Sequence, residues 1–348
     1  MAGRSAAGTA GRSAEPGTIA ICFVAAALQS VRARNLNADE LMAQVGLSPS
    51  LLQVPQARVS AKHYGALWRT IAHTLDDEFF GQDSRRMKAG SFAMLCHSVL
   101  SCGTLSQALK RSLRFYSLIL DDISGTFVRD AKEARIILHE RDAGASQRVF
   151  AHELLLMLLY GVSCWLVGRR ISILRAEFSY AEPAHSAEYR LMYCGDLSFN
   201  RPNTAISFDA GYLDLPVVQN EGSIKEFLRT APESILLKYK NGSSISAKVR
   251  RRLRQRLPGD VPDFEELAVD LNIAPATLRR RLHEEGASYQ GIKDQLRRDL
   301  AISYLSDSDR NVMDIALELG FSERSAFHRA FRKWTGASPG EFRRGLRP

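Results

Sequence analysis

Apolar and polar positions follow two periods along the chain, and their distribution divides the sequence into two parts. Through residues 18–216, apolar positions at helical spacing are interrupted by short stretches of period two, which is typical of an α+β domain. From residue 244 to 348 only the helical spacing occurs, which predicts an all-α domain. We therefore expect two domains joined by a connecting segment at 217–243. Residues 1–17, rich in Gly, Ala, Ser and Thr, are expected to form a disordered tail.

The first domain is expected to mix helices and strands. An apolar run at 19–28 continues at helical spacing through Val31 and Leu36, which predicts a first core helix. Alternation over 125–128 and 134–140 predicts two strands that form a hairpin. The other predicted helices are 61–75, 83–102, 105–120 and 148–167, and the other strand-like stretches are 171–180, 205–208 and 213–216.

The second domain contains two similar stretches, residues 264–282 and 312–331. Each predicts a short helix, a tight turn and a second helix, which is the helix-turn-helix pattern. The turn falls at Asn272 in the first unit and at Gly320 in the second, both residue types that tolerate a positive φ. With a one-residue insertion, Arg280 of the first unit aligns with Arg329 of the second.

The second helix of each unit has one apolar face and one polar face. Leu278 and Leu282 form the apolar face in the first unit, and Phe327, Phe331 and Trp334 form it in the second. The opposite faces carry Ala276, Arg279, Arg280 and His283 in the first unit, and Arg324, Ser325, His328, Arg329 and Arg332 in the second. Most solvent-exposed helices have such a charged face. Two units with basic second helices nevertheless favour DNA binding, in which that helix enters the major groove.

A specific family resemblance rests on these residues. Residues 315–339 read IALELGFSERSAFHRAFRKWTGASP, and Arg343 follows. This run is similar to the second-unit signature of the AraC/XylS family of bacterial transcription regulators, whose DNA-binding domain residues 264–344 resemble. Residues 297–305 match the long linker helix of that family. The resemblance implies double-stranded DNA as a partner, RNA polymerase as a second one, and activation more often than repression.

The first unit departs from the family pattern at three positions. Asn272 stands where Gly is usual, and Ala274 stands where a Ser N-cap is usual. The first unit should therefore lack a cap worth about 1 kcal/mol. Ala276 stands where a longer side chain often reaches a base, so it offers methyl contact at most. In the second unit, Ser322 is predicted to cap the recognition helix.

The polar residues of the two second helices are predicted to divide the reading of DNA. Arg280 and Arg329 hold equivalent positions, and either could contact guanine through two hydrogen bonds or hold a phosphate. The expected discriminating residues are Arg279, Arg324, Ser325 and His328.

A basic segment at 248–256 opens the second domain, and phosphate contact by Arg250, Arg251 and Arg254 is predicted there. The alternative is a solvated charged face. The formal net charge of the chain is +9, and residues 241–348 contribute 20 Lys/Arg minus 15 Asp/Glu, or +5. This excess suits a polyanion without proving one.

The first domain resembles the α+β effector domain of one AraC-family branch, which has an arabinose-binding-like N-terminal part. The resemblance rests on Pro183, Tyr189, residues 193–195, Phe199, Phe208 and residues 213–216. It implies a small-molecule effector and dimerisation. The pattern departs from the sugar barrel of the arabinose regulator, so it does not imply a sugar. The sequence leaves the ligand-binding residues undefined.

The first domain offers no catalytic motif. It contains no G-x-S-x-G, no H-E-x-x-H, no Gly-rich phosphate loop and no metal-spaced His/Cys cluster, so no cofactor or metal is expected. Its histidines occur singly and are interpreted as satisfied core or surface residues. Residues 37–52 also resemble a helix-turn-helix, but Pro55 interrupts its second helix, and that helix carries no basic residue before Arg58.

Cysteines and hydrophobic segments bear on the cellular compartment. Five widely spaced cysteines without a C-x-x-C pair indicate reduced thiols, with a redox or alkyl-acceptor thiol as the alternative. We find no run of the roughly 20 apolar residues that a membrane span needs. A cytoplasmic protein without a membrane partner is therefore expected.

Two other functions remain open, namely a nonspecific architectural DNA-binding protein and, less favoured, an enzyme with a DNA-binding tail. Residues 224–228 and 234–239 are predicted to form short helices that could support self-association, with a flexible break at 241–244.

Overall fold

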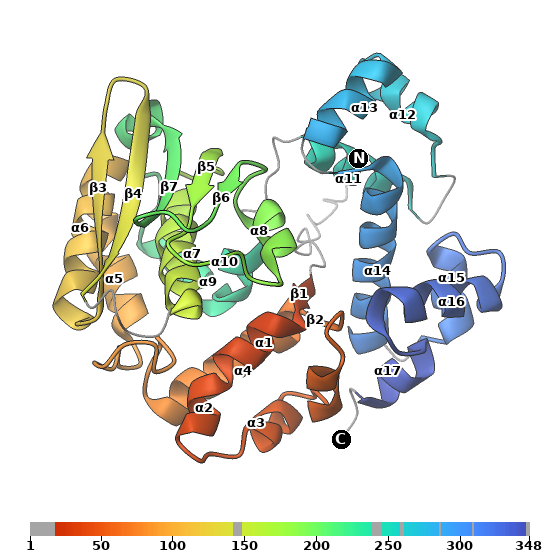
Figure 1. Cartoon of the computed structure of the whole chain (residues 1–348), viewed down its shortest axis with the longest axis horizontal. Coiled ribbons are helices and arrows are strands. Elements are labelled where there is room, and N and C mark those ends of the chain that lie inside the picture. Colours follow the sequence, from red (N-terminus) through yellow and green to blue (C-terminus); the bar gives the residue numbers. More distant parts are fainter. Residues whose placement is uncertain are drawn as a thin grey trace, which may run out of the picture.

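The chain forms an α+β part and an all-α part that contact each other over a limited surface (Figure 1). The computed structural model describes residues 18–141, 148–237, 245–257, 261–284, 287–307 and 310–345. The predicted tail at 1–17 and the predicted break at 241–244 lie outside these residues.

A five-stranded sheet organises the α+β part, with the strand order β3-β4-β7-β5-β6. The strands are β3 (Ile123–Arg129), β4 (Glu133–Glu140), β5 (Ile173–Glu177), β6 (Leu197–Ser198) and β7 (Thr204–Asp209). All pairs are antiparallel except β5 with β6. The β3–β4 hairpin is confirmed, with Gly125 opposite Leu138. The stretch at 213–216, expected to be strand-like, follows a 3-10 turn at Ala210–Asp214 instead. That turn forms because the Asp209 carboxylate accepts a hydrogen bond from the Gly211 amide.

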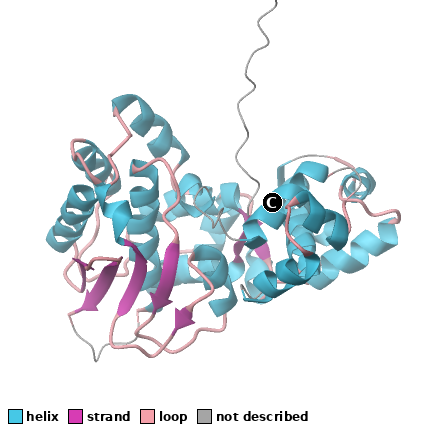
Figure 2. Cartoon of the chain, turned by 90° about the horizontal axis from the view of Figure 1, so that it is seen from above, coloured by secondary structure: helices cyan, strands magenta, loops and turns pink. Residues whose placement is uncertain are grey.

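Helices lie on one face of this sheet (Figure 2). Ala134, Ile136 and Leu138 alternate along β4 and are buried, on the side of α6 (Leu105–Ile119) and α7 (Val149–Leu166). The opposite face carries the ion pairs Arg135–Glu177, Arg175–Glu133 and Arg201–Glu177. This separation follows from the period-two pattern of the strands.

Helix α7 is the central helix of the α+β part. It is the one helix of the described residues that is long and apolar enough to cross a membrane, but 89% of it is buried inside the protein. This degree of burial is typical of a core helix in a globular domain.

A layer of short helices precedes the sheet in the chain. It contains β1 (Thr18–Ala20), α1 (Ile21–Ala27), α2 (Gln29–Ala33), α3 (Ala38–Gln44), a 3-10 turn (Pro49–Gln53), β2 (Arg58–Ser60), α4 (Ala61–Leu75) and α5 (Ser91–Leu100). The helix predicted at 83–102 begins only at Ser91, because carboxylates engage the preceding backbone. Asp77 accepts hydrogen bonds from the amides of Phe79, Gly81 and Met87.

Residues that were expected to connect the domains pack onto the α+β part. Helices α9 (Glu221–Thr230) and α10 (Glu233–Leu237) follow the short α8 (Ser186–Met192). Phe227 of α9 stacks on Trp165 with ring centroids 4.2 Å apart. Glu233 of α10 binds Arg69 through two hydrogen bonds of 2.9 and 3.0 Å. This packing leaves the apolar faces of both helices covered.

The all-α part consists of seven helices in the described residues. They are α11 (Ile245–Arg256), α12 (Phe264–Asp270), α13 (Pro275–Glu284), α14 (Tyr289–Asp307), α15 (Val312–Glu318), α16 (Arg324–Thr335) and α17 (Pro339–Gly345). Helix α14 has 19 residues, so it is about 28 Å long at 1.5 Å per residue. It stands between the α12–α13 unit and the α15–α16 unit (Figure 1). Its other side packs on the β1–β2 ribbon of the first part.

Candidate functional site

The first helix-turn-helix unit is specified by a capping box, a strained turn and an apolar seam. Asp263 accepts a hydrogen bond from the Glu266 amide at 2.8 Å, and Glu266 accepts one from the Asp263 amide at 3.0 Å. Asn272 adopts a φ of 54° at the turn, a left-handed conformation that Asn tolerates better than most residues. Leu278 and Leu282 are buried against the first helix, which confirms the predicted apolar face.

The second unit has the same kind of turn and apolar seam, but its second helix has no side-chain cap. Gly320 adopts a φ of 75° at its turn, and Phe327 and Phe331 are fully buried. The predicted cap at Ser322 is wrong, because α16 begins at Arg324 and Glu323 is the N-cap residue. Ser322 lies one residue too early, and the Glu323 side chain accepts a hydrogen bond from the Ser325 hydroxyl at 3.0 Å instead of capping the helix.

The predicted DNA-reading residues lie on the outer faces of α13 and α16. Arg279, Arg280 and His283 are exposed on α13, and the Arg279 guanidinium lies 5.0 Å from the centroid of the Phe264 ring. On α16, Arg324, Ser325, Arg329 and Arg332 are exposed and His328 is half-buried. The Arg324 Nε donates a hydrogen bond to His328 Nε2 at 3.3 Å. Each unit therefore presents its own basic surface.

The three arginines of α11 that are expected to contact the DNA backbone lie in different environments. Arg251 is exposed and Arg254 is half-buried. Arg250 instead turns toward α14, where it binds Asp299 at 3.0 Å and Gln295 at 3.2 Å. Phosphate contact by Arg250 would have to replace these internal bonds.

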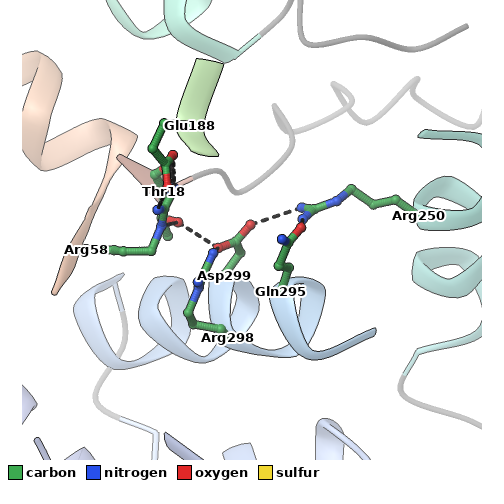
Figure 3. A network of polar contacts seen from close by, with 7 residues as sticks. All are labelled: Thr18, Arg58, Glu188, Arg250, Gln295, Arg298 and Asp299. Carbon is green, nitrogen blue, oxygen red and sulfur yellow. Dashed lines mark hydrogen bonds and ion pairs between the residues drawn. The ribbon is translucent and has the colours of Figure 1, made fainter. Parts of the chain in front are cut away.

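A polar network joins the two parts of the chain at this point (Figure 3). The Thr18 hydroxyl of β1 donates to Asp299 Oδ1 of α14 at 2.6 Å and accepts from Arg58 Nε at 2.8 Å. Arg58 in turn binds both carboxylate oxygens of Glu188, at 2.5 and 3.1 Å. On the other side, Asp299 is paired with Arg250 and Arg298. We call these residues the junction network.

The junction network is buried, so its charges are strongly coupled. Asp299 is 3% exposed and Arg58 is 5% exposed. Burial would lower the pKa of Arg58, but Glu188 and Asp299 raise it above its ordinary value. Burial lowers the pKa of Arg298, and Asp299 opposes that change. Each guanidinium therefore relies on a neighbouring carboxylate.

A cavity of about 70 Å³ lies directly behind this network. Its walls come from β1, α1, α4, α7, α8 and α10. Thr18 and Glu188 belong both to the junction network and to the cavity wall. The cavity is otherwise mainly apolar, and its further polar wall residues include Tyr64, Glu153, Tyr160 and Tyr193.

Glu153 and Tyr193 are the most informative residues of the cavity wall. Glu153 is 3% exposed, and its Oε1 accepts from the Tyr189 hydroxyl at 2.5 Å and lies 2.6 Å from His185 Nε2. The Tyr193 hydroxyl is buried without a hydrogen-bond partner in the part of the chain that the structure describes. Burial raises the pKa of Tyr193 well above its ordinary value, so the phenol stays protonated.

The sequence analysis did not identify this cavity, although the sequence contains one signal for it. His152 and Glu153 are ionisable residues near the start of a mainly apolar helix, and a carboxylate is rarely buried unless it has partners. His152 is a satisfied core residue, bound to Glu140 and Thr204 at 2.6 Å each. His185 differs from His152, because it contacts Glu153, the buried carboxylate of the cavity wall.

The thiols do not form a reactive site. All five cysteines are free, and burial raises the pKa of Cys164 and of Cys194 to about 11. Thiolate, the reactive form, is therefore scarce near pH 7. The described residues contain no group of three His, Cys, Asp or Glu side chains that could hold a metal ion.

Comparison with known proteins accounts for both parts of the chain. Residues 36–217 match the family described as the arabinose-binding domain of AraC transcription regulator, N-terminal. Residues 267–345 match a helix-turn-helix domain family. The chain belongs to the AraC family of transcription regulators.

The relatives of this AraC-family protein include regulators that match it over most or about half of its length. The ornithine utilization regulator of Pseudomonas aeruginosa is 29% identical over 326 residues, covering 93% of this chain and 96% of the relative. The regulator VirS of Mycobacterium tuberculosis is 29% identical over 166 residues, 48% of each chain. The crystal structure of CdpR from P. aeruginosa covers 92% of this chain and 97% of its own, with 18% identity and a TM-score of 0.32. The predicted fold class and the predicted class of function, a helix-turn-helix transcription regulator, are confirmed.

Proposed function

We propose that this AraC-family regulator binds a specific double-stranded DNA site through α13 and α16, placed in successive major grooves. The proposal rests on one observation, the equivalent basic surfaces of two helix-turn-helix units on one chain. Successive major grooves recur on one side of B-DNA about every 34 Å. Helix α14, about 28 Å long at 1.5 Å per residue, is a spacer of comparable size.

The proposed roles differ between the two recognition helices. On α13, Arg280 reads a guanine, with Arg279 held beside it by the Phe264 ring and His283 one turn further along. On α16, Arg329 is shared between base and phosphate, since Arg324, Ser325, His328 and Arg332 surround it on the same surface. Arg251 and Arg254 of α11 bind phosphate, and Arg250 serves mainly the junction network.

The cavity of the first part is the proposed effector site. A concave, mainly apolar site with a few convergent polar groups is the usual form of a small-molecule site, and this one borders the residues that hold the DNA-binding part. We further propose that the protein acts in the cytoplasm as an activator that contacts RNA polymerase, and that it forms a homodimer.

The full chain, footprinted on sites selected from random duplexes, tests the DNA-binding proposal. Two protected major grooves about one helical turn apart are expected. Protection of a single groove would refute the use of both units. Equal affinity for selected and random duplexes would favour the architectural alternative, and the two recognition surfaces, which differ in residue type, argue against that result.

A further inference from the structure

We infer that the cavity beside the junction network binds a small organic cation, a primary ammonium group on a short apolar chain. Glu153 is its counter-ion, and the Tyr193 hydroxyl oxygen accepts a second hydrogen bond from it. This inference rests on the proposed role of the cavity as the effector site, and it adds the chemical class of the effector.

The charges of the cavity wall select the sign of the ligand. Two carboxylates, Glu153 and Glu188, line the cavity, and no Lys, Arg or His does so among its described wall residues. Glu188 is already bound by Arg58 through both oxygens. Among the described residues, the partners of Glu153 are Tyr189 and His185, and both act at its Oε1. The basic partners of these carboxylates, Arg58 and His185, are not wall residues. An anion in the cavity would therefore meet the two carboxylates first, whereas an ammonium group would be stabilised.

The unsatisfied polar group locates the ligand. Tyr193 lines the cavity, and its hydroxyl is buried and has no partner among the described residues. A buried hydroxyl in this state is rare, because it loses its bonds to water without replacement. An ammonium group has three N–H donors, so one group can serve Glu153 and Tyr193 together. Its remaining donor faces the rest of the cavity.

The volume and the apolar wall set the size of the ligand. A water molecule needs about 10–15 Å³ of such a cavity, so about 70 Å³ has room for roughly five to seven non-hydrogen atoms. Ile19, Phe23, Met157 and Ile235 line the remainder and provide no hydrogen-bonding side-chain groups for a polar body. The ligand is therefore a linear alkylammonium of about five carbons rather than a sugar or a nucleotide.

A series of equal chain length tests this chemistry on the purified full chain. Pentylamine, 1-pentanol and pentanoate are titrated by calorimetry at pH 7.5. Pentylamine should bind about tenfold or more tightly than 1-pentanol, as expected for hydrogen bonds to a charged group, and pentanoate should not bind. Equal binding of the alcohol, tighter binding of pentanoate, or no binding of any of the three would overturn the inference.

Variants assign the preference to the named residues. Glu153→Gln should reduce the pentylamine-to-pentanol ratio to near one, and Tyr193→Phe should weaken pentylamine binding several-fold without changing the selection by charge. Glu226→Gln, an exposed acid on α9, is the matched control and should keep the wild-type ratio. If Glu153→Gln does not fold, the wild-type series and Tyr193→Phe still decide. A Glu153→Gln protein that keeps the wild-type preference would refute the role of Glu153.

DNA binding measured in the same samples separates this inference from the proposed function. Anisotropy of a labelled operator reports whether the chain binds specific DNA and whether pentylamine changes that affinity. Specific DNA binding together with failure of the ligand series would refute the ammonium class and leave the DNA-binding proposal intact. Tight pentylamine binding without any specific DNA binding would refute the proposed function instead.

Discussion

Replacing Asp299 by Asn should weaken the attachment of the DNA-binding part to the effector part. Asp299 lies on α14, and its carboxylate accepts a hydrogen bond of 2.6 Å from the Thr18 hydroxyl of β1. Arg250 and Arg298 of the DNA-binding part also donate hydrogen bonds to this carboxylate. Asn keeps the size of the side chain but removes its charge. It also introduces N–H donors where guanidinium groups already donate.

The expected magnitude follows from burial and charge. The junction network holds three guanidinium groups, those of Arg58, Arg250 and Arg298, and two carboxylates, those of Glu188 and Asp299. Removal of Asp299 leaves one carboxylate for three cations. Because Asp299 is 3% exposed, solvent screens little of this imbalance. Loss of one partner from a buried ion pair costs about 3–5 kcal/mol, and we expect a loss in this range.

Chemical denaturation of the full chain measures this loss, with a double-mutant cycle to locate it. Asp299→Asn and Thr18→Ala should be coupled by about 1 kcal/mol or more, because the two residues share a hydrogen bond across the junction. Asp294→Asn on the same helix, whose carboxylate accepts from Gln290, is the control and should change stability by less than about 0.5 kcal/mol. A loss below about 1 kcal/mol for Asp299→Asn, or additive effects with Thr18→Ala, would refute the network as a connection between the parts.

Three further expectations concern DNA reading and the cavity wall. Arg280→Ala should cost about 1–3 kcal/mol of operator binding and relax preference at one base position, and a uniform loss across single-base operator variants at fixed salt would make Arg280 a positioning residue instead. Five or more phosphate contacts should give a log–log salt slope of about −4.5 or steeper, and a nearly flat titration would contradict the basic surfaces as phosphate contacts. A Cβ at Gly161 would lie 2.5 Å from Ile235 Cγ2, so Gly161→Ala should displace α10 from the cavity at a cost of about 1–3 kcal/mol in unfolding free energy. Gly340→Ala, with open space around it, is the control, and equal effects of the two would contradict the packing argument.

The helix-turn-helix units were predictable because their signals are local. The turn at Asn272 or Gly320 and the apolar positions of each helix lie within about twenty residues of one another. The sequence was less reliable for the first residue of a helix. Asp77 holds the loop before Ser91, so the predicted helix begins late. Ser322 was expected to cap α16, but the helix begins two residues beyond it.

The cavity and the junction network were not predictable for a different reason. Thr18 and Asp299 lie 281 positions apart in the sequence, and neither occurs in a recognisable motif. Arg58 was read only as the first basic residue after a false helix-turn-helix, yet the structure places it between Thr18 and Glu188. Without the fold, nothing distinguishes a buried arginine on a short strand from a surface one.

If the cavity is the effector site, as proposed, the sharing of Thr18 and Glu188 between the cavity and the junction network would couple effector binding to DNA binding. A ligand that attracts Glu188 competes with Arg58 for that carboxylate, and Arg58 also holds Thr18 against Asp299. A change of the free energy of this contact by about 1.4 kcal/mol alters the balance between attached and released DNA-binding parts tenfold. By thermodynamic linkage, DNA that favours the released arrangement must change ligand affinity by the same factor. The sign of the effect depends on Glu188: a ligand bound at Glu153 that also withdraws the Glu188 carboxylate from Arg58 weakens the attachment.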